Sequence, residues 1–381
     1  MLLEGARAPG AKILVSGGSR CNVANAVVTD ADFWGGSRSS IRRVLRAFPV
    51  EETVAFFASI GVPLHEEANG KLFPDSNRSR DVLDALLRET NAQGAALHPG
   101  HRVEEVVADP KGFRITTPQG DLRAPRVVLA TGGRSLPKSG SDGAGIEMAR
   151  RLGHTVVPTT PALTPLLLSE DDPLHRLLSG VAHGVELSIW IDGARSRRIA
   201  GALLWTHIGV SGPAALDASR HWLRAEIEGR TPAITVNFVG GASFETIERT
   251  WIDLALSRPR ASVQHVLGGL MPASVASAWL PTLGVDGSTP LAHVSRSDRR
   301  TLAHALAAWP LPVSGARGYT AAEATAGGVS LAEIDPATME SRVQRGLFLV
   351  GEMLDVDGRL GGFNFQWAWA SGRVAGAAVA G

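Results

Sequence analysis

The stretch GLFLVGEMLDVDGRLGGFNFQWAWASG, residues 346–372, carries the clearest signal of fold class in this chain. It opens with a hydrophobic run typical of a buried strand and continues through Gly351-Glu352 and a polar turn. Paired glycines, Gly361 and Gly362, then precede a helical pattern that begins near Asn364. Glycines at a helix start let backbone N–H groups approach an anion, which the positive end of the helix dipole also attracts. The stretch therefore predicts an anion-binding strand–turn–helix unit of an α/β domain.

Two further stretches carry paired glycines. Residues 12–22, KILVSGGSRCN, hold Gly17 and Gly18, which fit either a plain tight turn or a turn whose backbone amides face a ligand. Residues 127–138, VVLATGGRSLPK, indicate a strand that ends at Gly132-Gly133, and strand ends of this kind are where α/β sheets bind ligands. The continuation misses the P-loop pattern, because Pro137 stands where glycine is required and lacks an amide donor. An ATPase is therefore excluded.

A fourth stretch, Thr325–Gly328 followed by Met339-Glu340-Ser341, completes a set that occurs in the same order in one known family. The four stretches resemble the signatures of the BaiN/YhiN-type FAD-dependent oxidoreductases (aminoacetone-oxidase family), from about residue 2 to the end. The resemblance implies an α/β fold, with a Rossmann-like FAD-binding domain built from both chain ends and an inserted β-rich module and helical module. It also implies an enzyme in which FAD carries a hydride between a donor, with NAD(P)H as a transient candidate, and a small organic substrate or oxygen.

The resemblance assigns cofactor binding to these stretches and to one acid near the start of the chain. The assigned residues are Glu4, Lys12, Ser16, Gly17, Gly18, Arg20, Cys21, Asn22, Thr131, Gly132, Gly133, Gly351, Glu352, Asp357, Gly361, Gly362, Phe363, Asn364 and Gln366. Glu4 matches the acid that hydrogen-bonds a ribose hydroxyl at the end of a second strand. The helix that opens at Asn364 would stabilise negative charge on a reduced flavin through its dipole. One position departs from the family: Ser19 replaces a third glycine, and serine adopts a positive φ less readily.

Several polar residues keep two interpretations. Arg20 is a candidate fixed charge for a phosphate or a flavin oxygen. Cys21 is either a redox thiol activated by that arginine or, since no second cysteine can resolve a disulfide, a small packed residue. His207, in a stretch like the family's FTHFGLSGP, is either a general acid–base or a structural histidine, and no other catalytic residue is predicted. Asp357, like its neighbour Asp355, is either a ribityl contact or part of the turn.

The start of the chain raises a second hypothesis. The family places a strand and a G-x-G-x-x-G turn about thirty residues before its SGGGRCN signature, and this sequence starts after that point. The first hypothesis is an active flavoenzyme. The alternative is a non-catalytic remnant or a mis-started fragment with weak or no FAD binding, because the turn is the main pyrophosphate cradle and the strand would be central in the sheet.

The composition is that of an ordinary globular protein. The 381 residues are 44% hydrophobic and 20% charged, with a net charge of +1. That balance and the lack of a basic run argue against nucleic acid or an anionic membrane as partner, which leaves a small-molecule substrate. A single cysteine and the lack of a signal-peptide pattern predict the cytoplasm. His98 and His101 have no acidic or cysteine neighbours at ligand spacing, so no metal site is predicted.

The hydrophobic pattern divides the chain into four segments. Residues 1–157 form the first part of the FAD-binding domain, 158–242 a β-rich insert, 243–309 a helical insert, and 310–381 a return to the FAD-binding domain. In the first segment we expect helices at 51–60, from Ser79 to near Gly94 with Ser79 as cap, and at 142–152. Strands are expected there at 102–107, 113–117 and 126–130, and in the β-rich insert at 185–191, 202–205 and 234–239.

Overall fold

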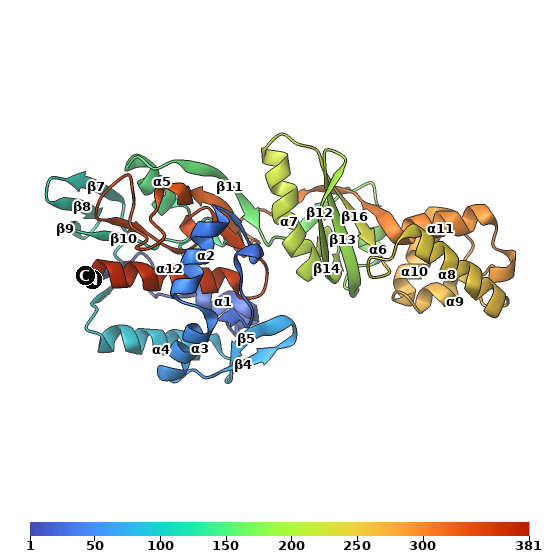
Figure 1. The fold of residues 1–381 in the computed structure, drawn as a ribbon, viewed down its shortest axis with the longest axis horizontal. Coiled ribbons are helices and arrows are strands. Elements are labelled where there is room, and N and C mark those ends of the chain that lie inside the picture. Colours follow the sequence, from blue (N-terminus) through green and yellow to red (C-terminus); the bar gives the residue numbers. More distant parts are fainter. Residues whose placement is uncertain (381) are drawn as a thin grey trace. The chain divides into compact units, whose positions relative to one another are not determined.

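The computed structural model describes residues 1–380, which form two compact units. One unit contains Met1–Ala162 and the chain from Tyr319 onward; the other contains Leu163–Gly318. In Figure 1 the first unit joins blue N-terminal elements to red C-terminal ones, and helix α12 (Phe363–Ala380) contacts helix α2 (Arg38–Ala47). Both ends of the chain therefore build the first unit.

Two parallel strand pairs identify the first unit as an α/β fold. Strand β1 (Leu2–Glu4) pairs with β6 (Leu97–Pro99), and β10 (Val127–Leu129) pairs with β20 (Leu347–Leu349). Parallel pairing needs a long crossover, and helices α1 to α4 lie between β1 and β6 in the chain. Because β10 and β20 run parallel, the stretches that follow them, 130–138 and 350–362, leave the strand pair on the same side although they are far apart in the sequence.

The other elements of the first unit surround these pairs. Its helices are α1 (Ala11–Ser19), α3 (Val50–Ser59), α4 (Ser79–Ala92) and α5 (Ala144–Arg151). Its antiparallel strands are β2 (Ala24–Asn25), β3 (Phe33–Gly35), β4 (Leu64–Glu67), β5 (Lys71–Pro74), β7 (Glu105–Asp109), β8 (Gly112–Thr117), β9 (Gly120–Ala124), β11 (Val156–Ala162), β19 (Ala324–Val329) and β21 (Val356–Gly358). They form the sheets β2–β5–β4, β7–β8–β9, β11–β19 and β21–β3.

The predicted helices of the first unit occur, with one wrong detail. Helix α3 ends one residue before Ile60, and Gly61 follows with a φ of 85°. The prediction that Ser79 caps α4 is wrong: Arg78 is the N-cap residue, and the Ser79 hydroxyl donates to the Leu14 carbonyl at 3.0 Å. A buried carbonyl from α1 offers that hydroxyl a tertiary partner in place of the helix end. The expected strands at 102–107, 113–117 and 126–130 correspond to β7, β8 and β10, whereas β9 and the short strands β2 to β6, β11 and β21 were not predicted.

The second unit contains a seven-stranded antiparallel sheet in the order β17–β16–β13–β14–β15–β12–β18. These strands are β12 (Leu166–Leu168), β13 (Ala182–Ile191), β14 (Ala194–Thr206), β15 (Gly209–Ser211), β16 (Pro232–Asn237), β17 (Trp309–Leu311) and β18 (Val313–Ala316). Its helices are α6 (Leu174–Leu177), α7 (Gly212–Ile227), α8 (Phe244–Ser257), α9 (Val263–Gly268), α10 (Ala273–Trp279) and α11 (Arg296–Ala308). Trp205 of the sheet and Trp279 of the helices are both buried in one continuous core. The segments predicted as separate β-rich and helical inserts thus share one compact unit.

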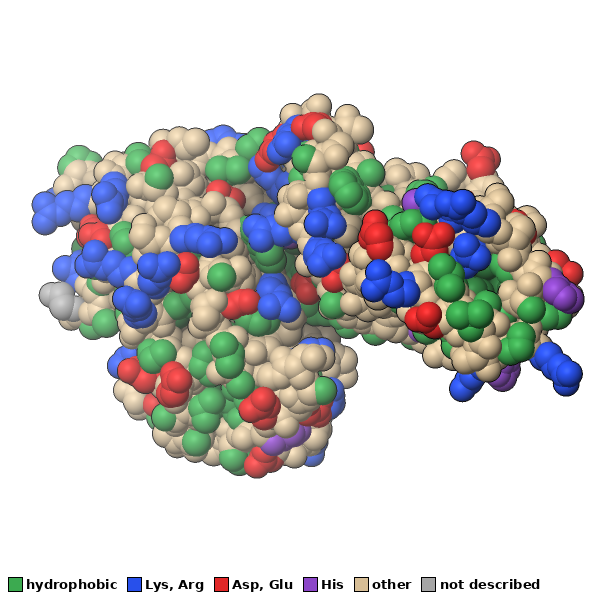
Figure 2. Space-filling view, turned by 45° about the vertical axis from the view of Figure 1, so that its right-hand side comes forward, with side chains coloured by type: hydrophobic (Ala, Val, Ile, Leu, Met, Phe, Trp, Pro, Cys, Tyr) green, Lys and Arg blue, Asp and Glu red, His purple; other side chains and the backbone are tan. Residues whose placement is uncertain are grey.

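Charge is distributed without a dominant sign. Figure 2 shows basic and acidic side chains intermingled over the visible face of the helical elements of the second unit, which agrees with the net charge of +1. Among the helices of residues 1–380, none is both long enough and apolar enough to cross a membrane.

Candidate functional site

The four glycine-containing stretches meet at the carboxylate of Glu352. Glu352 follows β20, and its carboxylate forms a short ion pair with the Lys12 ammonium of α1. The Ser135 hydroxyl, after β10, donates to this carboxylate at 2.6 Å and accepts from Lys12 at 2.6 Å. The Thr325 hydroxyl, on β19, donates to it at 2.9 Å. We call Lys12, Ser135, Thr325 and Glu352 the Glu352 cluster.

Gly133 is required for this cluster to form. A Cβ at Gly133 would collide with the Thr325 hydroxyl and come within 2.9 Å of the Glu352 carboxylate. Its absence lets the chain after β10 approach β19, so that the backbone N–H groups of Arg134 and Ser135 donate to the Thr325 hydroxyl oxygen at 2.8 and 3.1 Å. Ser135 and Thr325 are fully buried, and each of their hydroxyls is satisfied by these contacts.

The end of α1 carries the first glycine pair in a left-handed turn. Ser16 is extended, and Gly17, Gly18 and Ser19 follow with φ values of 55°, 67° and 67°. The positive φ expected at Ser19 is therefore present, at a conformational cost that a glycine would not carry. Gly17, Gly18 and Ser19 are exposed, and a Cβ at Gly18 would meet open space. The turn thus presents accessible backbone, as a ligand cradle requires.

The second glycine pair lies against the strand that follows the first. Gly361 and Gly362 have φ values of 120° and 95°, and a Cβ at Gly362 would collide with the Ala24 carbonyl group of β2. The Asn25 side chain donates to the Gly361 carbonyl at 3.1 Å. The Asn22 amide, oriented so that its nitrogen donates to the Ala24 and Leu72 carbonyls, accepts from the Gly362 N–H at 3.1 Å. The segment after the first glycine pair, through Asn22 and Asn25, is therefore hydrogen-bonded to the second glycine pair.

The side chains that open α12 hold the backbone in place. The Asn364 amide accepts from the Gly358 N–H at 2.8 Å and donates to the Gly358 carbonyl at 3.0 Å, which closes the loop before the helix. Gln366 is 1% exposed; it accepts from the Thr53 hydroxyl at 2.9 Å and donates to the Phe48 carbonyl at 2.9 Å. Phe363 packs edge-on against Phe33. At this helix end, backbone groups rather than these side chains are available to a ligand.

Gly351 is fixed from the far side by the same helix. Its N–H donates to the Ser371 hydroxyl at 3.0 Å, and its carbonyl accepts from the Trp367 indole at 3.1 Å. Gly351 has a φ of 70°, so glycine suits the turn that carries Glu352. Helix α12 therefore sets both the glycine pair at its start and the position of the Glu352 cluster.

Other predicted residues lie apart from the cluster. Arg20 makes two hydrogen bonds to Glu67, at 2.6 and 3.2 Å, and stacks on the Phe73 ring. The hydrogen bond from Arg20 holds the pKa of the Glu67 carboxyl below its usual range. The arginine charge is thus compensated within the protein, and a direct phosphate contact would require this pair to open.

The two predicted acids and the exit of β10 are placed as follows. Glu4 ends β1, and its carboxylate accepts from the Ala6 N–H at 2.7 Å. Asp357 is 1% exposed within β21, opposite Trp34. Thr131 is exposed, and Gly132 has a φ of 72° in a position where a Cβ would collide with the Ser141 hydroxyl. The Glu4 and Thr131 side chains are accessible, whereas Asp357 is buried in the turn.

Cys21 and His207, which each had two interpretations, differ in burial. Cys21 is fully buried with a φ of 64°, and burial raises the pKa of its thiol to about 11, although a hydrogen bond with Ser16 opposes the shift. It is therefore a packed residue and not an activated thiol. His207 lies in the second unit, exposed on the turn between β14 and β15.

Sequence reasoning missed several residues that shape this site. Asn25, Ser135 and Thr325 make the contacts described above. Lys71 lies beside the second glycine pair, since a Cβ at Gly361 would be 3.7 Å from the Lys71 Cε atom. Asn25 follows Asn22 by three positions in the same signature, and Ser135 follows the glycines by two, so proximity to the motifs was the available signal. Lys71 had none, because only β2–β5 pairing brings it there.

Comparisons with known proteins agree with this site. The profile of the HI0933-like protein Rossmann domain matches residues 1–378. A 3-dehydro-bile acid delta(4,6)-reductase from Clostridium scindens is 32% identical over 383 residues, which cover 100% of this chain and 92% of the relative. A ribosomal RNA dihydrouridine synthase from Escherichia coli is 31% identical over 371 residues, which cover 97% of this chain and 89% of the relative.

One solved structure shows only a distant likeness. A flavocytochrome c3 fumarate reductase in its open conformation covers 100% of this chain and 73% of its own, at 15% identity and a TM-score of 0.46, too low to carry an argument. The profile and the full-length relatives confirm the resemblance drawn from the four stretches. The chain therefore belongs to the HI0933-like Rossmann family and, with it, to the FAD-dependent oxidoreductases.

Proposed function

We propose that this protein is an FAD-dependent reductase that saturates a carbon–carbon double bond conjugated to a carbonyl group. The observation that carries this proposal is what the two named activities share. A 3-dehydro-Δ4,6 steroid is a conjugated dienone, and dihydrouridine is uridine with two hydrogens added across the double bond beside a ring carbonyl. In such a conjugated system the end of the double bond remote from the carbonyl is the electron-poor position, so a hydride would add there and a proton would complete the reduction.

Two glycine turns of the first unit have the properties that FAD binding requires. The left-handed turn Gly17–Ser19 presents exposed backbone with open space at Gly18. The second glycine pair precedes α12, where the helix dipole is positive, and contacts Asn22 and Ala24 in the segment that follows that turn. We therefore propose that these two turns hold the cofactor through backbone groups, with Lys71 adding positive charge. FAD bound there would supply the hydride.

The Glu352 cluster is proposed to position the cofactor-binding loops. It joins the chain after β10, β19, the residue after β20 and the start of α1, so one set of hydrogen bonds fixes four loops together. The remaining residues of the predicted cofactor set, including Glu4, Thr131 and Gly132, are proposed contacts on the sequence resemblance, and the buried Cys21, Asp357 and Gln366 would contribute only backbone groups. For the proton, His207 stays a candidate on the sequence resemblance alone.

NAD(P)H is proposed as the electron donor, with oxygen as the competing acceptor. The test is anaerobic mixing of the FAD-loaded protein with NADH or NADPH while the flavin absorbance is followed. Bleaching of the oxidised flavin band supports the reductase. If neither nucleotide bleaches it, whereas air reoxidises a chemically reduced sample rapidly, an oxidase is favoured instead. A cytoplasmic location remains proposed from the single cysteine.

Uridine in RNA is a second candidate substrate. Two relatives, from Escherichia coli and Haemophilus influenzae, carry the name of a ribosomal RNA dihydrouridine synthase at 31% and 30% identity. Nucleic acid, which the composition argued against, is therefore kept as a proposed partner. Parallel assays with a steroid dienone and with ribosomal RNA lacking dihydrouridine separate the two candidates, because only the true substrate would reoxidise the reduced flavin and gain two hydrogens by mass.

The first experiment is the visible absorption spectrum of the purified chain after FAD is added and the excess removed. A retained, shifted flavin spectrum supports the flavoenzyme. A colourless protein would contradict it and return the weight to the alternative of a chain with weak or no FAD binding.

A further inference from the structure

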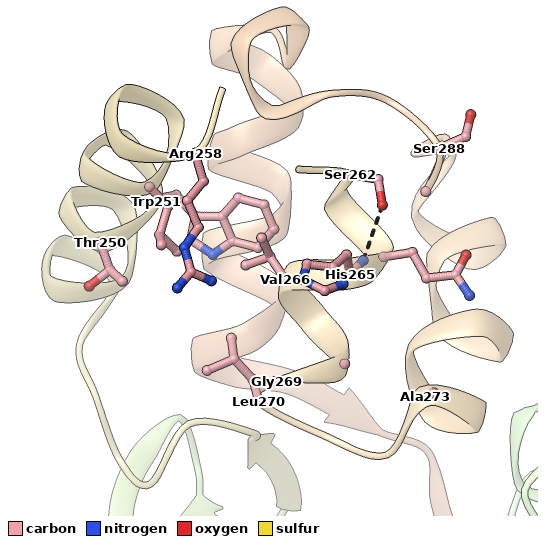
Figure 3. A pocket seen from close by; sticks show the side chains of 14 residues that line it. Thr250, Trp251, Arg258, Ser262, His265, Val266, Gly269, Leu270, Ala273 and Ser288 are labelled. Atoms are coloured by element: carbon pink, nitrogen blue, oxygen red, sulfur yellow. Dashed lines mark hydrogen bonds between the residues drawn. The ribbon is translucent and has the colours of Figure 1, made fainter. Parts of the chain in front are cut away.

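A cavity of about 910 Å³ lies among the helices of the second unit, outside every stretch assigned to FAD. Figure 3 shows it between α8, α9 and α10, with a turn at Ser288 on the far side. Apolar side chains make much of its wall, among them Trp251, Leu254, Val266 and Leu270. The volume is in the range of sites that take small organic ligands.

A single arginine of the described chain, Arg258, lines the cavity, with no lysine beside it. Arg258 lies at one end, and Figure 3 shows its guanidinium directed between Thr250 and Val266. No Asp or Glu lines the cavity. At the other end Ser288 donates to the Asp286 carboxylate at 2.8 Å.

Arg258 is exposed, and its surroundings differ from those of Arg299 and Arg300 on α11. Arg299 and Arg300 both face the Glu248 carboxylate, at 3.9 and 3.8 Å. Within residues 1–380, no carboxylate lies within 4.0 Å of Arg258. His265 also lines the cavity, and Figure 3 shows its ring near the centre of the wall.

We propose that this cavity binds an organic carboxylate with an elongated apolar body. The apolar wall takes the body, and the carboxylate pairs with Arg258, whose planar guanidinium suits a carboxylate. An inorganic anion lacks the apolar part, and a neutral hydrocarbon leaves the guanidinium unpaired. The proposal is independent of the proposed reduction, because it concerns binding and needs no turnover.

Glycine at position 268 permits a clean test. Gly268 lines the cavity, and a Cβ there would meet nothing within 4 Å at an ordinary φ. Gly268→Phe should fill the cavity without strain, and Gly268→Ala is its matched control. Arg258→Ala removes the charge, and Arg260→Ala removes an exposed arginine two positions away that does not line the cavity.

The measurement is isothermal titration calorimetry of the full chain with decanoate, and with neutral decanamide, without any electron donor. We expect decanoate to bind the unaltered protein at least tenfold more tightly than decanamide. Arg258→Ala should lose about that factor and Gly268→Phe should abolish binding, whereas Arg260→Ala and Gly268→Ala should retain it. Equal binding by all variants, equal binding of the two probes, or no decanoate binding to the unaltered protein would overturn the proposal.

Discussion

The Ser135 hydroxyl donates to the Glu352 carboxylate at 2.6 Å, although 217 positions separate the two residues in the chain. The contact exists because β10 and β20 pair in parallel and release their following loops on the same side. Lys12 and Thr325 reach the same carboxylate from two other parts of the first unit. The cluster is therefore the point where the fold converts four separate sequence stretches into one site.

Replacing Glu352 by Gln should weaken both the fold and the hold on FAD. The change leaves the Lys12 ammonium without its counter-charge while both side chains are largely buried, at 29% and 15% exposed. We expect a loss of about 1–3 kcal/mol in unfolding free energy and about tenfold in FAD affinity. Denaturant unfolding and flavin titration measure the two quantities.

The controls for this cluster separate it from ordinary ion pairs. Lys12→Met combined with Glu352→Gln should recover part of the loss, because the uncompensated charge is gone. Glu147→Gln breaks an exposed pair with Arg150 on α5 and should change stability by less than about 0.5 kcal/mol. An unchanged FAD affinity in Glu352→Gln would remove the cluster from the proposed site.

Gly362→Ala should be strongly destabilising. The residue has a φ of 95°, and a Cβ would collide with the Ala24 carbonyl group. We expect a cost of about 3 kcal/mol or more, since strain and a clash with rigid backbone add. Gly372→Ala within α12, where a Cβ meets nothing within 4 Å, should instead stabilise by about 0.5–1 kcal/mol. Similar effects from the two substitutions, measured by denaturant unfolding, would contradict the close approach of the two glycine turns.

Cys21 should react with iodoacetamide only when the protein unfolds. It is fully buried, and its pKa is raised by that burial to about 11 from 9.0. Because the folded state favours the neutral thiol, this contribution to stability is complete below about pH 9 and is lost as the pH rises toward 11. At pH 8 the labelling rate should rise in step with the unfolded fraction along a denaturant series. Rapid labelling of the native protein would show an accessible thiol.

The hydrogen bonds that the Glu333 carboxylate accepts should make the unfolding free energy sensitive to acid. The Ser341 hydroxyl lies 2.8 Å from His154 Nε2 and accepts the N–H groups of Val343 and Gln344, while His154 Nδ1 lies 2.9 Å from the Glu333 carboxylate. Partial burial raises the pKa of Glu333, but hydrogen bonds from Thr155 and His154 outweigh it, and the pKa is lowered overall.

A lowered carboxyl pKa stabilises the fold above its ordinary value and loses that effect as the pH falls through the folded value. The unfolding free energy should therefore fall between about pH 5 and pH 3 more steeply than in Glu333→Gln. Ser341→Ala, which removes the hydroxyl that contacts the buried His154 ring and accepts from the half-exposed Val343 and Gln344 N–H groups, should cost about 1–2 kcal/mol at neutral pH. Parallel pH profiles for the unaltered protein and Glu333→Gln would show that this carboxylate does not report on folding.

Much of the fold was predictable because local pattern decided it. The glycine pairs at 17–18, 132–133 and 361–362 needed conformations or close approaches that other residues resist, and they occur at turns as expected. Helix α3 and the longer strands of the second unit, β13, β14 and β16, followed from their apolar spacing, whereas the short strands β12, β15, β17 and β18 did not. The predicted capping role of Ser79 was wrong, because its hydroxyl donates to a carbonyl of α1 and not to the end of its own helix.

The sequence alone indicated the class of the protein, because four glycine-containing stretches in a fixed order resemble the signatures of one flavin-dependent family, and the comparisons confirm that family. The tertiary structure decided which side chains face a ligand. Asn22, Asn364 and Gln366, whose role in cofactor binding stays a prediction, have side chains that hold loops together. Ser135 and Thr325 became central only through strand pairing. Backbone conformation is set by residue type and near neighbours, whereas the partner of a polar side chain is set by whatever the fold brings within about 3 Å of it.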